Sequence, residues 1–190
     1  MMDKNSRVLP GGERSIHTVN NQNALEALSR EQLVELLGIY SKNWLALDGL
    51  WFQSVERKLG MDEAMEHDRE AWRDFTAIEA RRIKAFLGLP EQAGLEGLAR
   101  ALSLRLYANL NREAITIHGS TLTYRVLDCR VQAARRRKGM SYHPCKSVGL
   151  VEYAGFAQVI DPRISCRCLS CYPEASDDTC ACAWQFTLEE

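Results

Sequence analysis

Residues 114–127 read AITIHGSTLTYRVL, and this stretch marks the point where the sequence changes from a helical to a strand pattern. Thr, Ile, Tyr and Val alternate with other residues in Ala114 to His118 and in Thr121 to Leu127, as in paired strands. Gly119-Ser120 between the two runs suits a two-residue turn. The stretch therefore predicts a β-hairpin.

A long amphipathic helix is predicted well before this hairpin. Ser29 is a suitable N-cap with Gln32 three residues on, and Gly60 is a suitable residue to end the helix after about Leu59. Apolar residues recur at a spacing of three to four and form a stripe that is expected to face the core. The stripe consists of Leu33, Leu36, Leu37, Tyr40, Trp44, Leu47, Trp51 and Val55.

Two further helices are predicted between Asp62 and Gly88 and between about Leu95 and Leu110, with Pro90 separating them. Short turns between successive helices are typical of a packed helical layer. Residues 1–27 carry Leu9-Pro10-Gly11-Gly12 and a polar run, and they are predicted to be a flexible tail.

Two helices and two strands are predicted after the hairpin. A short basic helix covers Val131 to Lys138, and a second helix begins at His143-Pro144 and reaches about Val159. The strands cover Arg163 to Leu169 and Cys182 to Leu188. The order is α-α-α-β-β-α-α-β-β, which predicts an α+β fold with an N-terminal helical layer packed on a small antiparallel sheet. Residues 28–190 are expected to form one domain, helical over 28–110, with the sheet and a cysteine metal site over 111–190.

The composition limits the classes of function. The 190 residues are 46% hydrophobic and carry a formal net charge of −1, which predicts a globular core and gives no reason to expect nucleic acid or an anionic membrane as partner. The basic run from Arg135 to Lys138 is interpreted as a solvated helix end. No apolar run reaches the ~20 residues of a membrane span, and the N-terminus lacks the apolar segment of a secretory signal. A cytoplasmic protein is expected, with a small molecule as partner and a homodimer as a possible assembly.

All seven cysteines lie between positions 129 and 182, which is the most informative feature of the sequence. Cytosolic cysteines that cluster in this way usually bind metal or carry out chemistry, because disulfides are disfavoured there. Cys168 and Cys171 have the spacing of a pair that binds one ion, Cys145 lies in the first turn of a helix, and Cys180 or Cys182 can add a ligand. Zinc is the favoured metal, and an iron–sulfur cluster is the alternative that the spacing leaves open. Buried free thiols and a redox dithiol are the readings without a metal.

The segment from Cys145 through 149–156 (GLVEYAGF) to Cys168, Cys171 and 182–186 (CAWQF) resembles the vinyl-reductase-type small-molecule-binding domain. That domain occurs in photosynthetic pigment synthesis proteins and in aromatic-sensing transcription regulators. The resemblance implies zinc bound by Cys145, Cys168, Cys171 and Cys182, with Cys168 where the sensors often have Glu. The long gap after Cys171 leaves Cys180 as a competitor for the last ligand.

Residues 30–188 also resemble a family of uncharacterised bacterial cytosolic proteins that is distantly similar to aminothiazoline-carboxylate ring-opening hydrolases. The segments that carry this resemblance are 42–52, 79–83, 128–132 and 144–149. The resemblance implies, as an alternative function, a hydrolase that acts on a C–N or C–S bond of a small heterocycle.

Three carboxylates, those of Asp48, Asp68 and Glu79, lie on apolar stripes of the predicted helices. Each must find a partner there or shift its pKa. Ion pairs with Arg82, Arg105 or Arg125 would satisfy them. The alternative is a pocket between the helical layer and the sheet, with aromatic walls suited to a small cationic or heterocyclic ligand. Its predicted lining is Trp44, Asp48, Trp51, Asp68, Trp72 and Glu79.

Cys129, directly after the hairpin, is the candidate nucleophile if the protein is a hydrolase. Arg125 and Arg130 nearby would favour its thiolate, and a buried structural thiol is the alternative. His143 lies two residues before Cys145 and could replace a cysteine as metal ligand. His67 beside Asp68 could act as a general base or be a surface residue.

Overall fold

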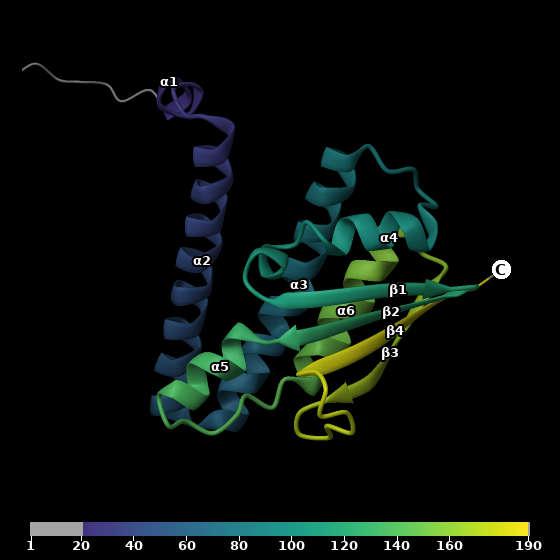
Figure 1. Ribbon diagram of the computed structural model, residues 1–190. Helices are drawn as coiled ribbons and strands as arrows, with labels where there is room; N and C mark the ends of the chain where they lie inside the picture. Colours follow the sequence, from purple (N-terminus) through teal and green to yellow (C-terminus); the bar gives the residue numbers. More distant parts are fainter. Residues whose placement is uncertain (1–20, 190) are drawn as a thin grey trace, which may run out of the picture. The chain divides into compact units, whose positions relative to one another are not determined.

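Four antiparallel strands form one sheet in the computed structural model, which describes residues 21–189 (Figure 1). They are β1 (Arg112–His118), β2 (Thr121–Asp128), β3 (Ile164–Cys171) and β4 (Cys182–Leu188), in the spatial order β1-β2-β4-β3. This arrangement, preceded by helices, confirms the predicted α+β class. Because β4 pairs with both β2 and β3, the last cysteines of the chain lie beside the ends of both strands.

The predicted hairpin is formed by β1 and β2, and Gly119 in its turn has a φ of 59°, a left-handed conformation that glycine adopts without steric cost. The side chains of β2 alternate strictly, and Leu122, Tyr124 and Val126 are buried on one face. The alternation of residues in the sequence of β2 therefore identifies which face of the sheet is buried.

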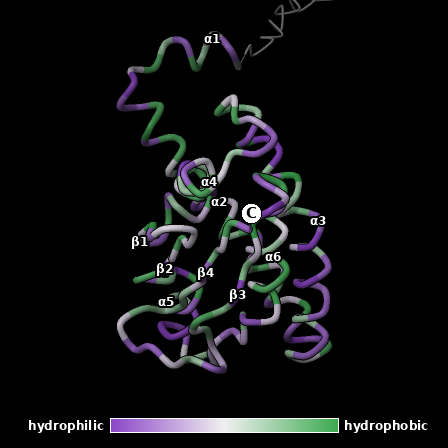
Figure 2. Tube along the Cα trace, turned by 90° about the vertical axis from the view of Figure 1, so that its right-hand side faces the viewer, coloured by the Kyte–Doolittle hydropathy of each residue, from purple (hydrophilic) through white to green (hydrophobic). Residues whose placement is uncertain are grey.

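Helix α6 (Lys146–Ile160) covers that face, and α3 (Met61–Leu87) packs on α6 from outside. Figure 2 shows this order from the side, with the strands, α6 and the more hydrophilic α3 in succession. Helix α4 (Gly94–Leu102) contacts α6, β2 and β4. The core between these layers contains Phe156, Ile160, Trp184 and Phe186, all fully buried.

Two glycines allow α6 to approach both of its neighbours closely. A Cβ atom at Gly149 would lie 2.5 Å from Cζ2 of Trp184 in the sheet. A Cβ atom at Gly155 would lie 2.8 Å from Cγ2 of Thr76 in α3. The hydroxyl of Thr76 also donates a hydrogen bond of 2.8 Å to the backbone carbonyl of Glu152. Helix α6 is therefore in contact with both neighbouring layers through its own backbone.

The third predicted helix is shorter than expected. Helix α4 ends at Leu102, and a 3-10 turn, η1 (Leu106–Asn109), follows in place of a helix that reaches Leu110. Arg105 between them is extended, with φ −64° and ψ 158°, and its side chain turns into the core. The ion pairs that it makes there, described below, explain why the helix stops.

The other helices lie close to their predicted ranges. Helix α5 (Arg130–Arg137) is the basic helix, and α6 begins after Cys145, which is its N-cap residue, and not at Pro144. Gly88 ends α3 in the left-handed conformation expected of a glycine at this position.

The N-terminal helices differ more from the prediction. Residues 21–26, expected in a flexible tail, form helix α1 (Asn21–Glu26), whereas residues 1–20 lie outside the described part of the chain. Helix α2 (Arg30–Leu59) begins with the predicted capping box. The backbone NH of Gln32 donates to the Ser29 hydroxyl, and the backbone NH of Ser29 donates to the side-chain carbonyl of Gln32. The chain divides into two compact units between Glu35 and Leu36.

Only part of the apolar stripe of α2 faces inward as predicted, with Trp44 half-buried against Trp72 and Phe75. Within the second unit, Leu47 is 69% exposed and Trp51 is 71% exposed. The helix also directs the neighbouring face inward, with Ser41 buried and Asp48 and Phe52 half-buried. Polar residues thus occupy part of the contact face of α2, which a search for apolar periodicity does not reveal.

Asp161 joins the start of α4 to the start of β3. Its carboxylate, which is 0% exposed, accepts a hydrogen bond of 2.9 Å from the backbone NH of Gly94 and an ion pair of 2.8 Å from Arg163. These contacts, led by Arg163, hold the pKa of Asp161 well below its usual range.

We expect Asp161→Asn to destabilise the protein by about 1–3 kcal/mol at pH 7, because the amide loses the charge-assisted contacts. A depressed folded pKa gives stability that is complete above the unfolded value of about 3.9, decreases below it, and is lost as the pH falls through the folded pKa. The difference between wild type and variant should therefore shrink at about pH 3. Urea unfolding at both pH values measures it, with the exposed Asp178→Asn as control. An equal difference at both pH values would contradict the role of the charge.

Candidate functional site

Three cysteines from different elements meet at one end of the sheet. The sulfur of Cys145, the N-cap residue of α6, lies 3.6 Å from the sulfur of Cys171 at the end of β3. Cys171 is paired with Cys182, the first residue of β4, which brings the third thiol to the same end of the sheet. The Lys146 NH donates to the Tyr172 carbonyl over 3.1 Å, so the backbones of α6 and β3 also meet here. We call Cys145, Cys171 and Cys182 the thiol cluster.

His143 lies against the thiol cluster and is held in one orientation. Its Nε2 is 3.1 Å from the Asp68 carboxylate, and its ring packs on Phe52 with centroids 4.6 Å apart. Gln132 in α5 accepts a hydrogen bond from the His143 NH over 3.0 Å and donates one to the His143 carbonyl over 2.8 Å. The Cys145 thiol acts electrostatically on the imidazole, and the buried Nδ1 of the ring has no hydrogen-bond partner among residues 21–189.

The protonation of this group is redistributed by its contacts. The hydrogen bond with Cys171 lowers the pKa of Cys145 more than burial raises it, and His143 adds to this effect, so the pKa is about 5. Burial lowers the pKa of His143, but the hydrogen bond to Asp68 and the electrostatic effect of the nearby Cys145 outweigh it and raise the pKa to about 9. The contacts with Cys145 and Cys182 raise the pKa of Cys171 well above its usual value. A negative sulfur and a positive imidazole are thus favoured side by side.

The remaining two cysteines of β3, Cys166 and Cys168, lie earlier in the strand than Cys171. Cys168 pairs with Trp184, and Cys166 pairs with Phe186, both on the core-facing side. Burial raises the pKa of Cys168 and raises that of Cys166 to about 12. Cys168 is therefore near the thiol cluster but is not one of the three sulfurs that meet.

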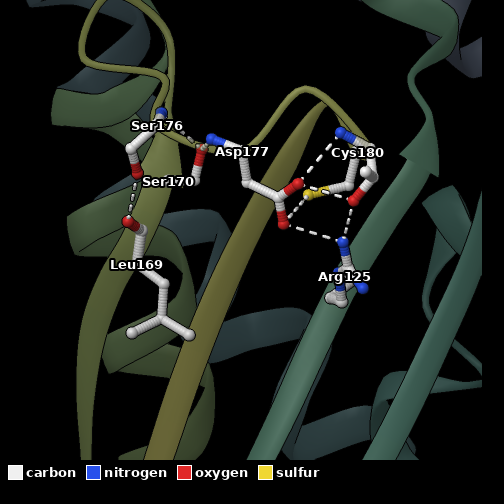
Figure 3. A network of polar contacts seen from close by, with 7 residues as sticks. Arg125, Leu169, Ser170, Ser176, Asp177 and Cys180 are labelled. Carbon is white, nitrogen blue, oxygen red and sulfur yellow. Dashed lines mark hydrogen bonds and ion pairs between the residues drawn. The ribbon is translucent and has the colours of Figure 1, made fainter.

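Cys180 takes part in a polar network with Asp177 and Arg125 (Figure 3). Its thiol donates to the Asp177 carboxylate over 3.5 Å, and this carboxylate also pairs with Arg125 of β2 over 2.7 Å. The Ser170 hydroxyl accepts hydrogen bonds from the backbone NH groups of Ser176 and Asp177. The loop between β3 and β4 is thus held by polar contacts, and of the two candidates for a last ligand Cys182 is the one beside Cys171.

Cys129 has an environment different from the one expected. It is the N-cap residue of α5 and packs against the main core. Burial raises its pKa to about 12, so the thiol stays protonated near pH 7. Arg125, which was expected to favour the thiolate, binds Asp177 and Thr179 instead. The prediction of a nucleophilic Cys129 therefore loses its electrostatic argument.

A cavity of about 380 Å³, lined in part by His143, lies between α2, α3, α5 and α6. Phe52, Trp72 and Tyr107 contribute aromatic surface to it, and Asp48, Asp68 and Glu152 contribute carboxylates. Burial, together with the charge of Asp68, raises the pKa of Asp48 to about 6 against the opposing effect of His143. His143 thus forms part of the cavity wall and also acts electrostatically on Cys145 of the thiol cluster.

Three of the six predicted pocket residues line this cavity, namely Asp48, Asp68 and Trp72. Trp44 packs behind the wall, stacked on Phe75 with ring centroids 5.9 Å apart. Trp51 is exposed at a shallow depression beside the cavity. His67 is an exposed residue beside Glu63.

Glu79 has a structural environment. Its carboxylate accepts hydrogen bonds of 3.0 Å from Nε of Arg105 and 3.0 Å from the Leu106 NH. The Nη2 of Arg105 pairs with Glu152 over 2.5 Å, and burial raises the pKa of Glu152 to about 7 despite this cation. Arg105 is therefore the partner of Glu79, as the ion-pair reading of the apolar stripes allowed.

Comparison with known proteins gives one assignment. Residues 26–188 match a family model described as "Family of unknown function (DUF6125)". The chain belongs to this family. No curated protein matches it. The description of the DUF6125 family names no activity, so the resemblances to vinyl-reductase-type domains and to aminothiazoline-carboxylate hydrolases stay predictions.

Two further findings bear on what this DUF6125 member can do. No helix within residues 21–189 is long and apolar enough to cross a membrane. In the same part of the chain, no group of three or more His, Cys, Asp or Glu side chains is arranged so that it could hold a metal ion as it stands. A metal at the thiol cluster would therefore require side-chain rotations there.

Sequence reasoning missed the roles of Gln132 and Glu152 in this DUF6125 member. The Gln132 side chain forms hydrogen bonds with both the backbone NH and the backbone carbonyl of His143, and it also donates to the Cys145 sulfur over 3.6 Å. Glu152 lies one helical turn beyond Val148 on the cavity side of α6. An acidic residue in the middle of an apolar helix is the signal that could have found Glu152.

Proposed function

We propose that this protein binds a zinc ion through the thiolates of Cys145, Cys171 and Cys182, beside a pocket for a small molecule. The observation that carries the proposal is the meeting of these thiols from three separate elements, with two sulfurs 3.6 Å apart. Tetrahedral zinc with bonds of about 2.3 Å to sulfur separates its ligand sulfurs by about 3.8 Å. All seven cysteines are free, as expected of a protein in the reducing cytosol.

His143 is the fourth ligand in this proposal. Its Nε2 contacts Asp68, and its Nδ1 is buried and without a partner among residues 21–189. Histidines that bind metal commonly donate their other ring NH to a carboxylate, which fixes the ring. Three thiolates and one imidazole would close a structural zinc site. Cys168, the fourth cysteine that the family resemblance implied, is the competitor for this position.

Elemental analysis of anaerobically purified protein tests the proposal. We expect about one zinc per chain in the wild type, and loss of both the zinc and part of the folding stability in Cys145→Ser, because metal binding and folding are linked. Cys180→Ser is the matched control, since that thiol belongs to the Asp177 network, and it should keep its zinc. A wild-type protein that stays metal-free and stable with zinc in excess would refute the proposal.

Cobalt substitution separates the candidates for the fourth position. Loss of His143 in His143→Gln should change the visible spectrum of the cobalt protein, whereas Cys168→Ser should leave it unchanged. The reverse result would make Cys168 the ligand. A brown protein that contains iron would replace zinc with an iron–sulfur cluster, the alternative that thiolate ligands also suit.

A further inference from the structure

The cavity between α2, α3, α5 and α6 contains one carboxylate that no protein group neutralises. Asp68 contacts His143, and Glu152 is paired with Arg105. Asp48 faces the same cavity from α2 and has neither an ion pair nor a hydrogen bond within residues 21–189. A half-buried carboxylate without a partner has lost part of its hydration, and no protein group compensates for this cost. A cation that bound to the carboxylate would compensate for it.

Besides the paired groups Asp68, His143 and Glu152, much of the inner wall is apolar and part of it is aromatic. Phe52, Trp72 and Tyr107 line it, together with Val131 of α5 and Val148 of α6. The volume of about 380 Å³ falls within the range of small-molecule sites, which begins at about 300 Å³. Aromatic faces also attract cations that lose their water. A flat apolar body with one positive nitrogen therefore matches both parts of the wall.

The basic residues that line the cavity do not neutralise Asp48. Arg135 is bound by Glu56 over 2.7 Å, the buried His143 is bound by Asp68 over 3.1 Å, and the others are exposed side chains at the rim. Solvent screens charges at the rim, whereas a charge pair inside the cavity acts at a lower dielectric constant. The rim residues are Lys42, Arg130, Arg137 and Lys138.

We infer that this cavity binds a small organic cation of the amine or amidine type, whose nitrogen pairs with the Asp48 carboxylate and whose apolar body lies among Phe52, Trp72 and Tyr107. The inference does not depend on zinc, since Asp48 is not one of the proposed metal ligands. It names a ligand class, an anchoring residue and a binding site that the family description does not contain.

Calorimetric titration at pH 7.5 with three probes of one shape tests the inference. Benzylammonium, benzyl alcohol and benzoate differ in charge and share the aromatic ring. We expect benzylammonium to bind the wild type about tenfold or more tightly than benzyl alcohol, because a charge-assisted contact is made only by the ammonium. Failure of benzylammonium to bind at millimolar concentration would overturn the inference. Tighter binding of benzoate would also overturn it, and would make the basic rim the recognition element.

The variant Asp48→Asn removes the charge and keeps the shape of the side chain. It should bind benzylammonium no better than benzyl alcohol, while Asp74→Asn, at an exposed position of α3, should behave as the wild type. An unchanged preference for benzylammonium in Asp48→Asn would overturn the role of this residue. Zinc content and melting temperature of each variant are measured in parallel. If Asp48→Asn does not fold, the ranking of the three probes on the wild type decides the inference.

Discussion

Replacing Arg105 with alanine is expected to destabilise the protein by about 3–5 kcal/mol, because it leaves two buried carboxylates without their cation. The Arg105 side chain is buried, pairs with Glu79 over 3.0 Å and with Glu152 over 2.5 Å, and its guanidinium lies 4.9 Å from the ring centre of Phe156. Removal of its packing adds to the loss of charge. Urea unfolding at pH 7 measures the effect.

A triple variant provides the control for this prediction. Arg105→Met combined with Glu79→Gln and Glu152→Gln removes the cation and both charges together, and should recover part of the stability lost in Arg105→Ala. A loss below about 1 kcal/mol in Arg105→Ala would show that water reaches the two carboxylates.

Replacing Trp184 with alanine is expected to cost a similar amount, about 3–5 kcal/mol, through the cavity that it leaves in the core. Trp184 in β4 is fully buried, and its ring centre lies 4.7 Å from that of Tyr153. It also fills the space that Gly149 leaves on α6. Equilibrium unfolding followed by circular dichroism measures the loss.

Trp184→Phe distinguishes the contribution of ring volume from that of the indole NH. The buried Nε1 of Trp184 has no hydrogen-bond partner in the part of the chain that the structure describes. Phenylalanine loses volume but removes this unsatisfied donor, so it should cost clearly less than alanine. Equal losses in the two variants would contradict this account of the site.

The sequence predicted best those parts of the fold that depend on local chemistry. The hairpin around Gly119, the capping box at Ser29 and the end of α3 at Gly88 each follow from backbone preferences of a few neighbouring residues. The α+β class follows from the change of period after these helices.

Features that depend on partners distant in sequence were not predictable to the same extent. The 3-10 turn after α4 follows from Arg105 meeting Glu79 and Glu152, which lie 26 and 47 residues away. Likewise, the exposure of Trp51 follows from which face of α2 meets α3, and apolar spacing alone does not determine that.

The candidate site shows the same division. Clustering of cysteines in the sequence indicated that thiols would gather, and Cys145, Cys171 and Cys182 do meet. The bulge between Cys168 and Ser170 shifts the register of β3 by one residue, so Cys171 and not Ser170 lies opposite Cys182. A bulge of one residue cannot be placed from spacing alone.

The two glycines of α6 also determine how the thiol cluster tolerates change elsewhere in the protein. With backbone against Trp184 at Gly149 and against Thr76 at Gly155, the helix has no flexible side chain that could absorb a displacement of either neighbour. Any shift of the sheet or of α3 is therefore transmitted along α6 to its N-cap residue, Cys145. The sulfur geometry at one end of α6 is in this way tied to the packing of Thr76 of α3 against Gly155, ten residues after Cys145.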